Sequence, residues 1–205
     1  MKNISVLLFL LITLALNAQN NKTSGLNARQ FHKYWKVESE SPDYKVTFLG
    51  DTVEILSPKG LTLWRKEKMS GKVTIEYDAC VVVEVEGDRL SDLNCFWMAS
   101  DPQYPDNIWK REKWRSGIFL NCYSLQLYYM GYGGNHNSTT RFRRYDGNEA
   151  AITNAKARPA ILKEYTDADH LLEANKWYHI KITNENNRVS YYINGVRLVD
   201  FRDAD

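Results

Sequence analysis

The sequence predicts an all-β protein, and more closely a two-sheet jelly-roll sandwich. Apolar and polar residues alternate with a period of two along most of the chain, and no segment shows a convincing helical period. Turn-forming residues separate the alternating segments at regular intervals, which is typical of antiparallel sandwiches and barrels. No longer internal repeat is visible, which argues against a propeller or a solenoid.

Composition and charge exclude several classes of protein. The 205 residues are enough for one large domain or two small ones, and 43% hydrophobic with 25% charged residues is typical of soluble globular chains. The formal net charge of +2 gives no global excess that would indicate binding to nucleic acid or to an anionic membrane. The 6 Trp, 13 Tyr and 7 Phe indicate that some aromatic rings lie outside the core.

The first residues are expected to be a signal peptide over residues 1–18. Lys2 supplies a positive charge, residues 4–16 form an apolar run too short to span a bilayer, and Ala18 precedes the expected cleavage point. The alternatives are an uncleaved anchor or a buried helix. We expect residues 19–33 to be disordered and residues 34–205 to form the jelly-roll domain. The predicted location is periplasmic or secreted, with no membrane span after cleavage.

The three cysteines, Cys80, Cys95 and Cys122, favour buried free thiols over a disulfide, because an odd count leaves one thiol unpaired. Their spacing matches no metal-ligand pattern. We therefore assign no metal ligands, and the sequence specifies no cofactor.

The strands are expected in the following order. Residues 46–48 and 53–55 flank a turn at Gly50-Asp51, and residues 73–86 form a long strand with one polar face. Residues 94–100, 117–123, 125–130 and 139–145 are further strand candidates, and a short helix is expected around residues 166–173.

The C-terminal part of the chain carries the clearest hairpins. Residues 176–183 and 188–193 flank an Asn-rich turn, and Asn194-Gly195 leads into a return strand over residues 196–201. The chain stops at Asp205, soon after that strand. Two alternatives follow: the strands close without another element, or the chain is a C-terminally truncated gene product.

The glycine-rich stretch of residues 128–137 is the richest local signal for a binding site. Its glycines allow the backbone to pass close to a ligand, and Asn135 and His136 are expected at a loop tip. They are candidates for contacting a sugar, with His136 as an acid or base. A simple tight turn is an equally good interpretation.

A basic strand follows that stretch. On a strand, Arg141, Arg143 and Tyr145 share one face, and two neighbouring guanidinium groups can bind a carboxylate such as that of a uronic acid. The alternative is an exposed strand whose arginines pair with nearby acids. We also expect Trp97 to lie on an open face, where its ring can stack on a sugar, although core packing is the default for any single tryptophan.

The chemistry that these residues favour is that of a polysaccharide lyase. Such an enzyme needs a positive group for the carboxylate, a base for the C5 proton and an acid for the leaving oxygen. Arg141 or Arg143, His136, and Tyr128 or Tyr145 are residues of the right types. No diagnostic carboxylate pair is present, so glycoside hydrolysis is less favoured.

Several longer motifs resemble the YesU-like family of bacterial proteins. They are residues 94–102, 123–135, 139–146, 162–167 and 177–180. The resemblance covers roughly residues 34–205. It implies a concanavalin A-like jelly roll and an association with the use of rhamnogalacturonan and other plant polysaccharides, but it carries over no established catalytic residue.

The sequence therefore predicts an exported protein that acts on acidic plant or algal polysaccharide, with a lyase favoured over a glycoside hydrolase. The alternative is a non-catalytic carbohydrate-binding module. The expected partner is a polysaccharide or oligosaccharide and not a nucleic acid. The expected catalytic residues are His136, Tyr128 and Tyr145, and the expected substrate-binding residues are Trp97, Asn135, Arg141 and Arg143.

Overall fold

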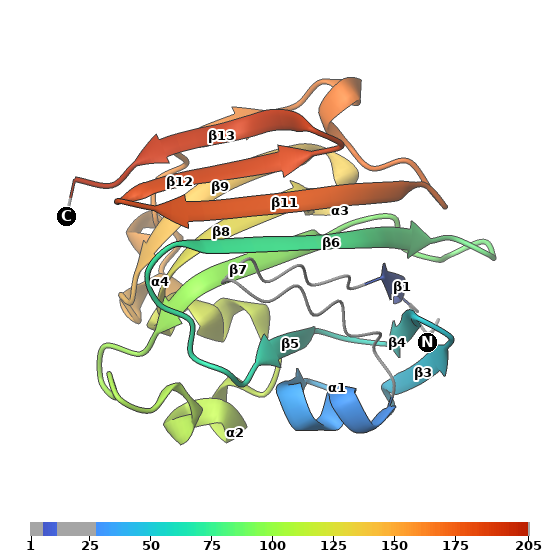
Figure 1. The fold of residues 1–205 in the computed structure, drawn as a ribbon, viewed down its shortest axis with the longest axis horizontal. Helices are drawn as coiled ribbons and strands as arrows, with labels where there is room; N and C mark the ends of the chain where they lie inside the picture. Colours follow the sequence, from blue (N-terminus) through green and yellow to red (C-terminus); the bar gives the residue numbers. More distant parts are fainter. Residues whose placement is uncertain (1–5, 12–27, 205) are drawn as a thin grey trace.

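The computed structural model describes residues 6–11 and 28–204, which form two packed antiparallel sheets and a small third sheet (Figure 1). The larger sheet has seven strands in the order β13-β12-β11-β6-β1-β4-β3. Their bounds are β1 Val6–Leu11, β3 Lys45–Leu49, β4 Thr52–Ser57, β6 Val73–Val82, β11 Trp177–Glu185, β12 Arg188–Ile193 and β13 Val196–Arg202.

The smaller sheet has four strands in the order β10-β9-β8-β7, and β2 pairs with β5 in a sheet of their own. Their bounds are β2 Trp35–Ser39, β5 Leu61–Arg65, β7 Leu93–Ser100, β8 Gln126–Gly133, β9 Thr139–Asp146 and β10 Lys163–Tyr165. The helices are α1 Ala28–Tyr34, η1 Ile108–Arg111, α2 Glu112–Arg115, η2 Phe119–Ser124, α3 Gly134–Asn137, α4 Ala150–Thr153, η3 Ala155–Ala157 and η4 Ala168–His170.

The predicted two-sheet sandwich of the jelly-roll class is confirmed by this arrangement. The long strand β6 shows why the alternating pattern was informative. Tyr77, Ala79 and Val81 point into the core between the sheets, while Glu76 and Asp78 lie on the other face and pair with Lys181 and His179 of β11. A strand with one buried face requires this alternation, because successive side chains point to opposite sides of the sheet.

A second apolar cluster lies on the outer face of the smaller sheet. Leu127, Tyr129 and Tyr145 project from β8 and β9 into it, and Trp64 of β5 covers them. The Trp64 ring stacks on Phe96 of β7, with ring centroids 5.9 Å apart. The smaller sheet is therefore covered on both faces over part of its area, which explains part of the high aromatic content.

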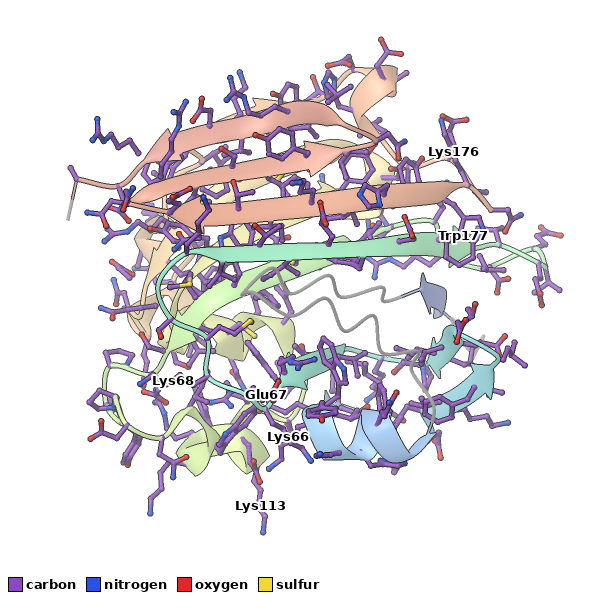
Figure 2. The ribbon with its side chains drawn as sticks, in the orientation of Figure 1. Lys66, Glu67, Lys68, Lys113, Lys176 and Trp177 are labelled. Carbon is purple, nitrogen blue, oxygen red and sulfur yellow. The ribbon has the colours of Figure 1, made fainter. Side chains whose placement is uncertain are left out.

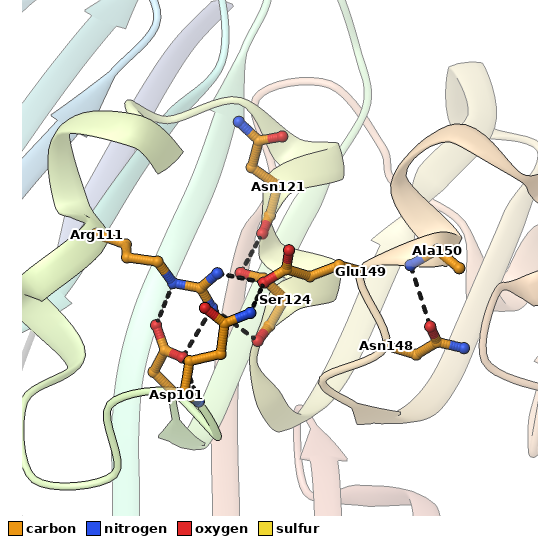
Figure 3. A network of polar contacts seen from close by, with 8 residues as sticks. Asp101, Arg111, Asn121, Ser124, Asn148, Glu149 and Ala150 are labelled. Carbon is orange, nitrogen blue, oxygen red and sulfur yellow. Dashed lines mark hydrogen bonds and ion pairs between the residues drawn. The ribbon is translucent and has the colours of Figure 1, made fainter.

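An ion-pair network holds the loop that follows β7 (Figure 3). Arg111 donates two hydrogen bonds of 2.7 Å to the buried carboxylate of Asp101 and also pairs with Glu149. Gln103 donates to the same Glu149 carboxylate, at 2.8 Å. The side chain of Asp101 holds the pKa of the Arg111 guanidinium above its usual value. The network ties the loop to the segment before α4.

Three predictions about secondary structure need correction. The expected strand at 117–123 is wrong, because Phe119–Ser124 forms the 3-10 helix η2, whose Cys122 and Tyr123 are buried against the outer face of the smaller sheet. The expected disorder is wrong for residues 28–33, which belong to α1. Phe31 anchors that helix in the core against Phe48, with ring centroids 5.5 Å apart. The helix expected around 166–173 is limited to Ala168–His170.

The N-terminal predictions lie only partly within the described residues. Residues 1–5 and 12–27 fall outside them, and Val6–Leu11 forms β1, which pairs with both β4 and β6. Removal of residues 1–18 stays a prediction. Across the part of the chain that is described, no helix is long and apolar enough to cross a membrane. The three cysteines are free, as predicted, and Cys80 and Cys122 are buried.

Candidate functional site

A cleft of about 1350 Å³ runs along the edge strand β7, and it is lined by residues of the outer face of the smaller sheet, such as Tyr129, and by residues between the two sheets, such as Tyr77. Its walls come from β5, from the loop before η1, and from the exposed ends of β7, β8 and β9. The residues that could contact a polar ligand there include Arg89, Asp92, Asn94, Asp106, Asn107, Tyr129, Asn135, His136, Arg141, Arg143 and Arg158.

A row of polar residues crosses the sheet within this cleft. The strand register places Asn94 of β7 opposite Gly131 of β8, Gly131 opposite Arg141 of β9, and Arg141 opposite Glu164 of β10. Residues directly opposite one another in adjacent strands lie on the same face of a sheet. The row therefore presents an amide, a gap where the glycine has no side chain, a guanidinium and a carboxylate in sequence.

The gap at Gly131 is filled by the hydroxyl end of Tyr129. A Cβ atom built at Gly131 would lie 2.1 Å from the Tyr129 hydroxyl oxygen, so no larger residue fits without displacing that ring. The Tyr129 hydroxyl donates a hydrogen bond of 3.0 Å to Oδ1 of Asn94. Burial raises the pKa of Tyr129 well above its usual value, and the guanidinium groups of Arg143 and Arg141 oppose this rise. The hydroxyl is thus protonated at neutral pH.

The arginines of the cleft differ in their partners. Arg141 donates from Nε to the Glu164 carboxylate at 2.6 Å, and this pair is about one-third exposed. Arg143 donates to the carbonyl oxygen of Pro159. Among the described residues, neither Arg143 nor Arg158 has a carboxylate within ion-pair distance, and the Arg158 guanidinium lies 5.7 Å from the Tyr123 ring centroid. Two positive groups without acidic partners therefore border the cleft.

The loop at one end of the cleft has an unusual backbone. Asn135, His136 and Asn137 have φ angles of 52°, 57° and 56°, in the left-handed region that L-residues rarely occupy in succession. Asn137 stabilises the loop, because its amide donates to the Leu172 carbonyl and accepts from the Leu172 N–H, each at 2.8 Å. Asn135 and His136 are exposed at the tip and line the cleft. Such strained turns concentrate at binding sites.

The cleft brings together most of the predicted site residues. All the predicted site residues except Tyr128 line it, namely Trp97, Asn135, His136, Arg141, Arg143 and Tyr145. Arg141 and Arg143 share the outer face of β9 as expected. Arg141 also has an acidic partner, as the alternative interpretation required, although the acid is Glu164 of the neighbouring strand.

The prediction that Trp97 lies on an open face is wrong. Its side chain is 4% exposed and packs in the core between the sheets, where it stacks on Phe142 and Tyr191 with centroids 6.1 Å apart. Phe96 takes the outer face instead. Met98 lies at a register irregularity of β7 with φ of 54°, so the alternation that would pair it with Phe96 is interrupted there.

The two tyrosines expected to be catalytic lie on opposite faces of the smaller sheet. Tyr128 lies on the inner face of the smaller sheet and donates a hydrogen bond to Asp203 at 2.5 Å. Burial and Asp203 raise the pKa of Tyr128 to about 12. Tyr145 faces the outer side, but it is 2% exposed beneath Tyr123, and its hydroxyl has no hydrogen-bond partner among the described residues. Tyr128 is absent from the lining of the cleft, whereas Tyr145 contributes to the lining although it is almost completely buried.

Four residues of the cleft were not among the predicted site residues: Asn94, Tyr129, Arg158 and the half-buried Trp109. Trp109 lies on η1, where Asn107 caps the helix by accepting from the Trp109 N–H at 3.1 Å. The alternation of β8 did place Tyr129 and Gly131 on one face. That pairing was the available signal, because a glycine between polar neighbours indicates a close approach.

Acidic residues in and beside the cleft are partly paired with arginines, whereas Asp106 has no ion pair among the described residues. Asp92 pairs with Arg89, and Glu164 pairs with Arg141. Within the described ranges, no group of three or more His, Cys, Asp or Glu side chains could hold a metal ion. The cleft can therefore offer fixed positive charge, amide groups and a protonated phenol to a ligand.

Comparisons with known proteins give one family and one distant structure. Residues 55–205 match the model of a family described as a domain of unknown function (DUF6250). No curated protein matches this sequence. The solved structure of the carbohydrate binding module CBM66 from Bacillus subtilis is similar at 13% identity and a TM-score of 0.40, over 83% of this chain and 80% of that chain. Similarity at this level does not indicate a shared ligand.

Proposed function

We propose that this chain, which belongs to the DUF6250 family, is an exported protein whose cleft binds an acidic polysaccharide or oligosaccharide. The observation that carries the proposal is the pair Arg143 and Arg158, which border the cleft without acidic partners among the described residues. A guanidinium binds a carboxylate in a two-pronged geometry, and uronic acids are the sugars that carry carboxylates.

The other groups of the cleft fit the neutral part of such a ligand. Asn94, Asn135 and the Tyr129 hydroxyl offer donors and acceptors to sugar hydroxyl groups. The half-buried ring of Trp109 lines the same cleft and replaces Trp97 as the candidate for stacking on a sugar. Pockets of this kind combine an apolar surface with a few fixed polar groups that set specificity.

Binding without catalysis is the function that the cleft supports best. Of the three expected catalytic side chains, Tyr128 does not line the cleft and Tyr145 is almost completely buried, and Asp92, a carboxylate of the lining, is paired with Arg89. The association with rhamnogalacturonan and the export of the chain rest on the sequence and belong to the same proposal.

A lyase is the second candidate, because one observation favours it. The exposed His136 and the protonated hydroxyl of Tyr129 line the same cleft as Arg143. In such a reaction His136 would take the C5 proton of the uronate, the C4–O bond would break, and Tyr129 would protonate the leaving oxygen. The product would carry a C4–C5 double bond.

The binding proposal is tested by calorimetric titration with an oligogalacturonate. Arg143→Ala should weaken binding at least tenfold, or about 1.4 kcal/mol, because a charged hydrogen bond contributes about 1.5–3 kcal/mol. The matched control is Arg188→Ala on β12, an exposed arginine paired with Asp200 on the larger sheet. Equal affinity in the parent chain and both variants would contradict the proposal.

The same ligand separates binding from cleavage. A lyase would produce absorbance near ~235 nm from the unsaturated uronate, and His136→Ala would abolish it while leaving binding in place. Tight binding with no absorbance and no new reducing ends would establish a binding module. New reducing ends without absorbance would indicate hydrolysis and contradict both candidates.

A further inference from the structure

The centre of the larger sheet contains a strand that the sequence predicts to be removed. β1 lies between β4 and β6, and it pairs antiparallel with both. Its residues, Val6–Leu11, fall inside the apolar run of the expected signal peptide. A central strand and a cleaved leader are therefore built from the same residues.

Loss of β1 would leave a slot with the dimensions of one strand. Adjacent strands lie about 4.8 Å apart, so β4 and β6 would face each other across about 10 Å. Residues 53–57 and 78–82 would lose the partners with which they are in register. Two such facing edges carry unpaired N–H and C=O groups, which pair readily with any suitable extended chain.

The neighbours of the slot specify an apolar occupant. Position 8 of β1 lies opposite Ile55 and Val81, and position 10 lies opposite Val53 and Ala79. These four side chains are almost completely buried in the core, and none carries a charge. An occupant must therefore be apolar at alternating positions on the core side, since an unpaired polar group there would be costly.

We propose that the slot between β4 and β6 is a strand-acceptor site, which β1 fills in the full chain and an apolar strand of another polypeptide fills once residues 1–18 are removed. The incoming strand runs antiparallel to both neighbours and supplies at least five residues. Recognition follows strand addition, in which main-chain hydrogen bonds supply affinity and alternate side chains supply specificity. Removal of the leader thereby makes the sheet competent to assemble with a partner.

The register offers a direct test in the full chain. Position 9 of β1 stands directly opposite Cys80, a free cysteine of β6. Directly opposite residues in antiparallel strands have Cα separations of about 4.5–5.5 Å, within the range that a disulfide spans. The Phe9→Cys variant should therefore form a disulfide with Cys80 under a mild oxidant, as read by peptide mapping. The matched control, Leu8→Cys, stands opposite Val81 and should form none. A missing bond in Phe9→Cys, or equal bonding in both variants, would overturn the proposal.

The acceptor property is tested on the chain recovered after export. Its mass should show loss of residues 1–18, and a lysine-flanked peptide of sequence Val-Leu-Leu-Cys-Leu-Leu should then form a disulfide with Cys80 and raise the unfolding temperature. The parent full chain, with its slot occupied, should not capture the peptide, and a peptide with a central proline should fail in both. If the processed chain is unfolded alone, recovery of its β-sheet circular dichroism on adding the peptide supports the proposal. Retention of residues 1–18, or no capture and no recovery, overturns it.

Discussion

The buried ion pair between Arg115 and Glu38 connects helix α2 to strand β2. Arg115 Nη2 lies 2.6 Å from Glu38 Oε1, and Arg115 Nε lies 3.2 Å from Oε2. Arg115 is 0% exposed and Glu38 is 5% exposed. Nη1 of Arg115 has no hydrogen-bond partner among the described residues. We predict that Glu38→Gln is strongly destabilising, because it leaves the guanidinium charge buried without a counter-ion.

The size of the loss follows from this geometry. Two hydrogen bonds to charged groups contribute about 1.5–3 kcal/mol each, and removing one partner of a buried pair costs about 3–5 kcal/mol. The free energy of unfolding should therefore fall by about 3–5 kcal/mol in Glu38→Gln. Replacing both residues with apolar ones, as in Glu38→Leu with Arg115→Met, should restore most of the lost free energy of unfolding. The reason is that the double variant no longer has to bury two charges, so the cost of their desolvation is removed.

Urea unfolding of four proteins provides the test: the parent, Glu38→Gln, the apolar double variant and a surface control. The control is Asp200→Asn, which breaks the exposed two-pronged pair with Arg188 and should have little effect on the free energy of unfolding. If Glu38→Gln loses no more than this control, or if the double variant is as unstable as the single one, the account of a buried, mutually dependent pair is refuted.

Four further predictions concern the buried thiols and the tyrosines. Burial raises the pKa of Cys95 from 9.0 to about 11 and that of Cys122 to about 12. The contribution of the protonated Cys95 thiol to the free energy of unfolding is therefore fully present below pH 9.0 and is lost as the pH rises toward about 11. Unfolding temperatures measured across that range would detect the loss. A thiol reagent at pH 8 should accordingly react with neither residue in the native protein, and fast reaction would show that the core is open. Gly131→Ala should displace the Tyr129 ring and weaken oligogalacturonate binding at least tenfold without unfolding the chain, and unchanged affinity would remove Tyr129 from the site. Tyr145→Phe should leave binding unchanged and alter the free energy of unfolding by less than about 1 kcal/mol, because no protein group loses a hydrogen bond; a larger loss would reveal an unseen partner.

Much of the fold was predictable because alternation is a local property. The face of β6 that carries Tyr77, Ala79 and Val81 follows from its sequence, as does the turn at Asn194-Gly195. The 3-10 helix over Phe119–Ser124 was not predictable from alternation, because the packing of Cys122 and Tyr123 against the smaller sheet decides its form. Helix α1 was not predictable from alternation either, because contacts of Phe31 with residues far away in the sequence hold it in place.

The site was predictable only in part, because a sandwich has two faces that can both be covered. Arg141 and Arg143 were assigned to one face correctly, since their strand is regular. Trp97 was assigned to the wrong face because a covering layer around Trp64 makes the outer side of β7 apolar as well, and the irregularity at Met98 hides the register. Tyr145 shares a face with the arginines, yet the rings of Tyr123 and Tyr129 close over it.

Other exposed aromatic residues offer a surface that competes with the cleft as a binding site. Trp177 of β11 is 46% exposed on the outer face of the larger sheet (Figure 2). Arg188 and Arg197, on the strands beyond β11, both pair with Asp200. A carboxylate ligand should therefore prefer the cleft, and Trp177→Ala should leave its affinity unchanged.

The central claim is that the carboxylate of the ligand is recognised, and one comparison tests it most directly. The parent protein is titrated with an oligogalacturonate and with the methyl ester of the same oligosaccharide, which keeps every hydroxyl group but removes the charge. The account predicts that the ester binds at least tenfold more weakly, and that added salt weakens the acid more than the ester. Equal affinities for the two ligands, or no binding of the acid by the folded protein, would contradict it.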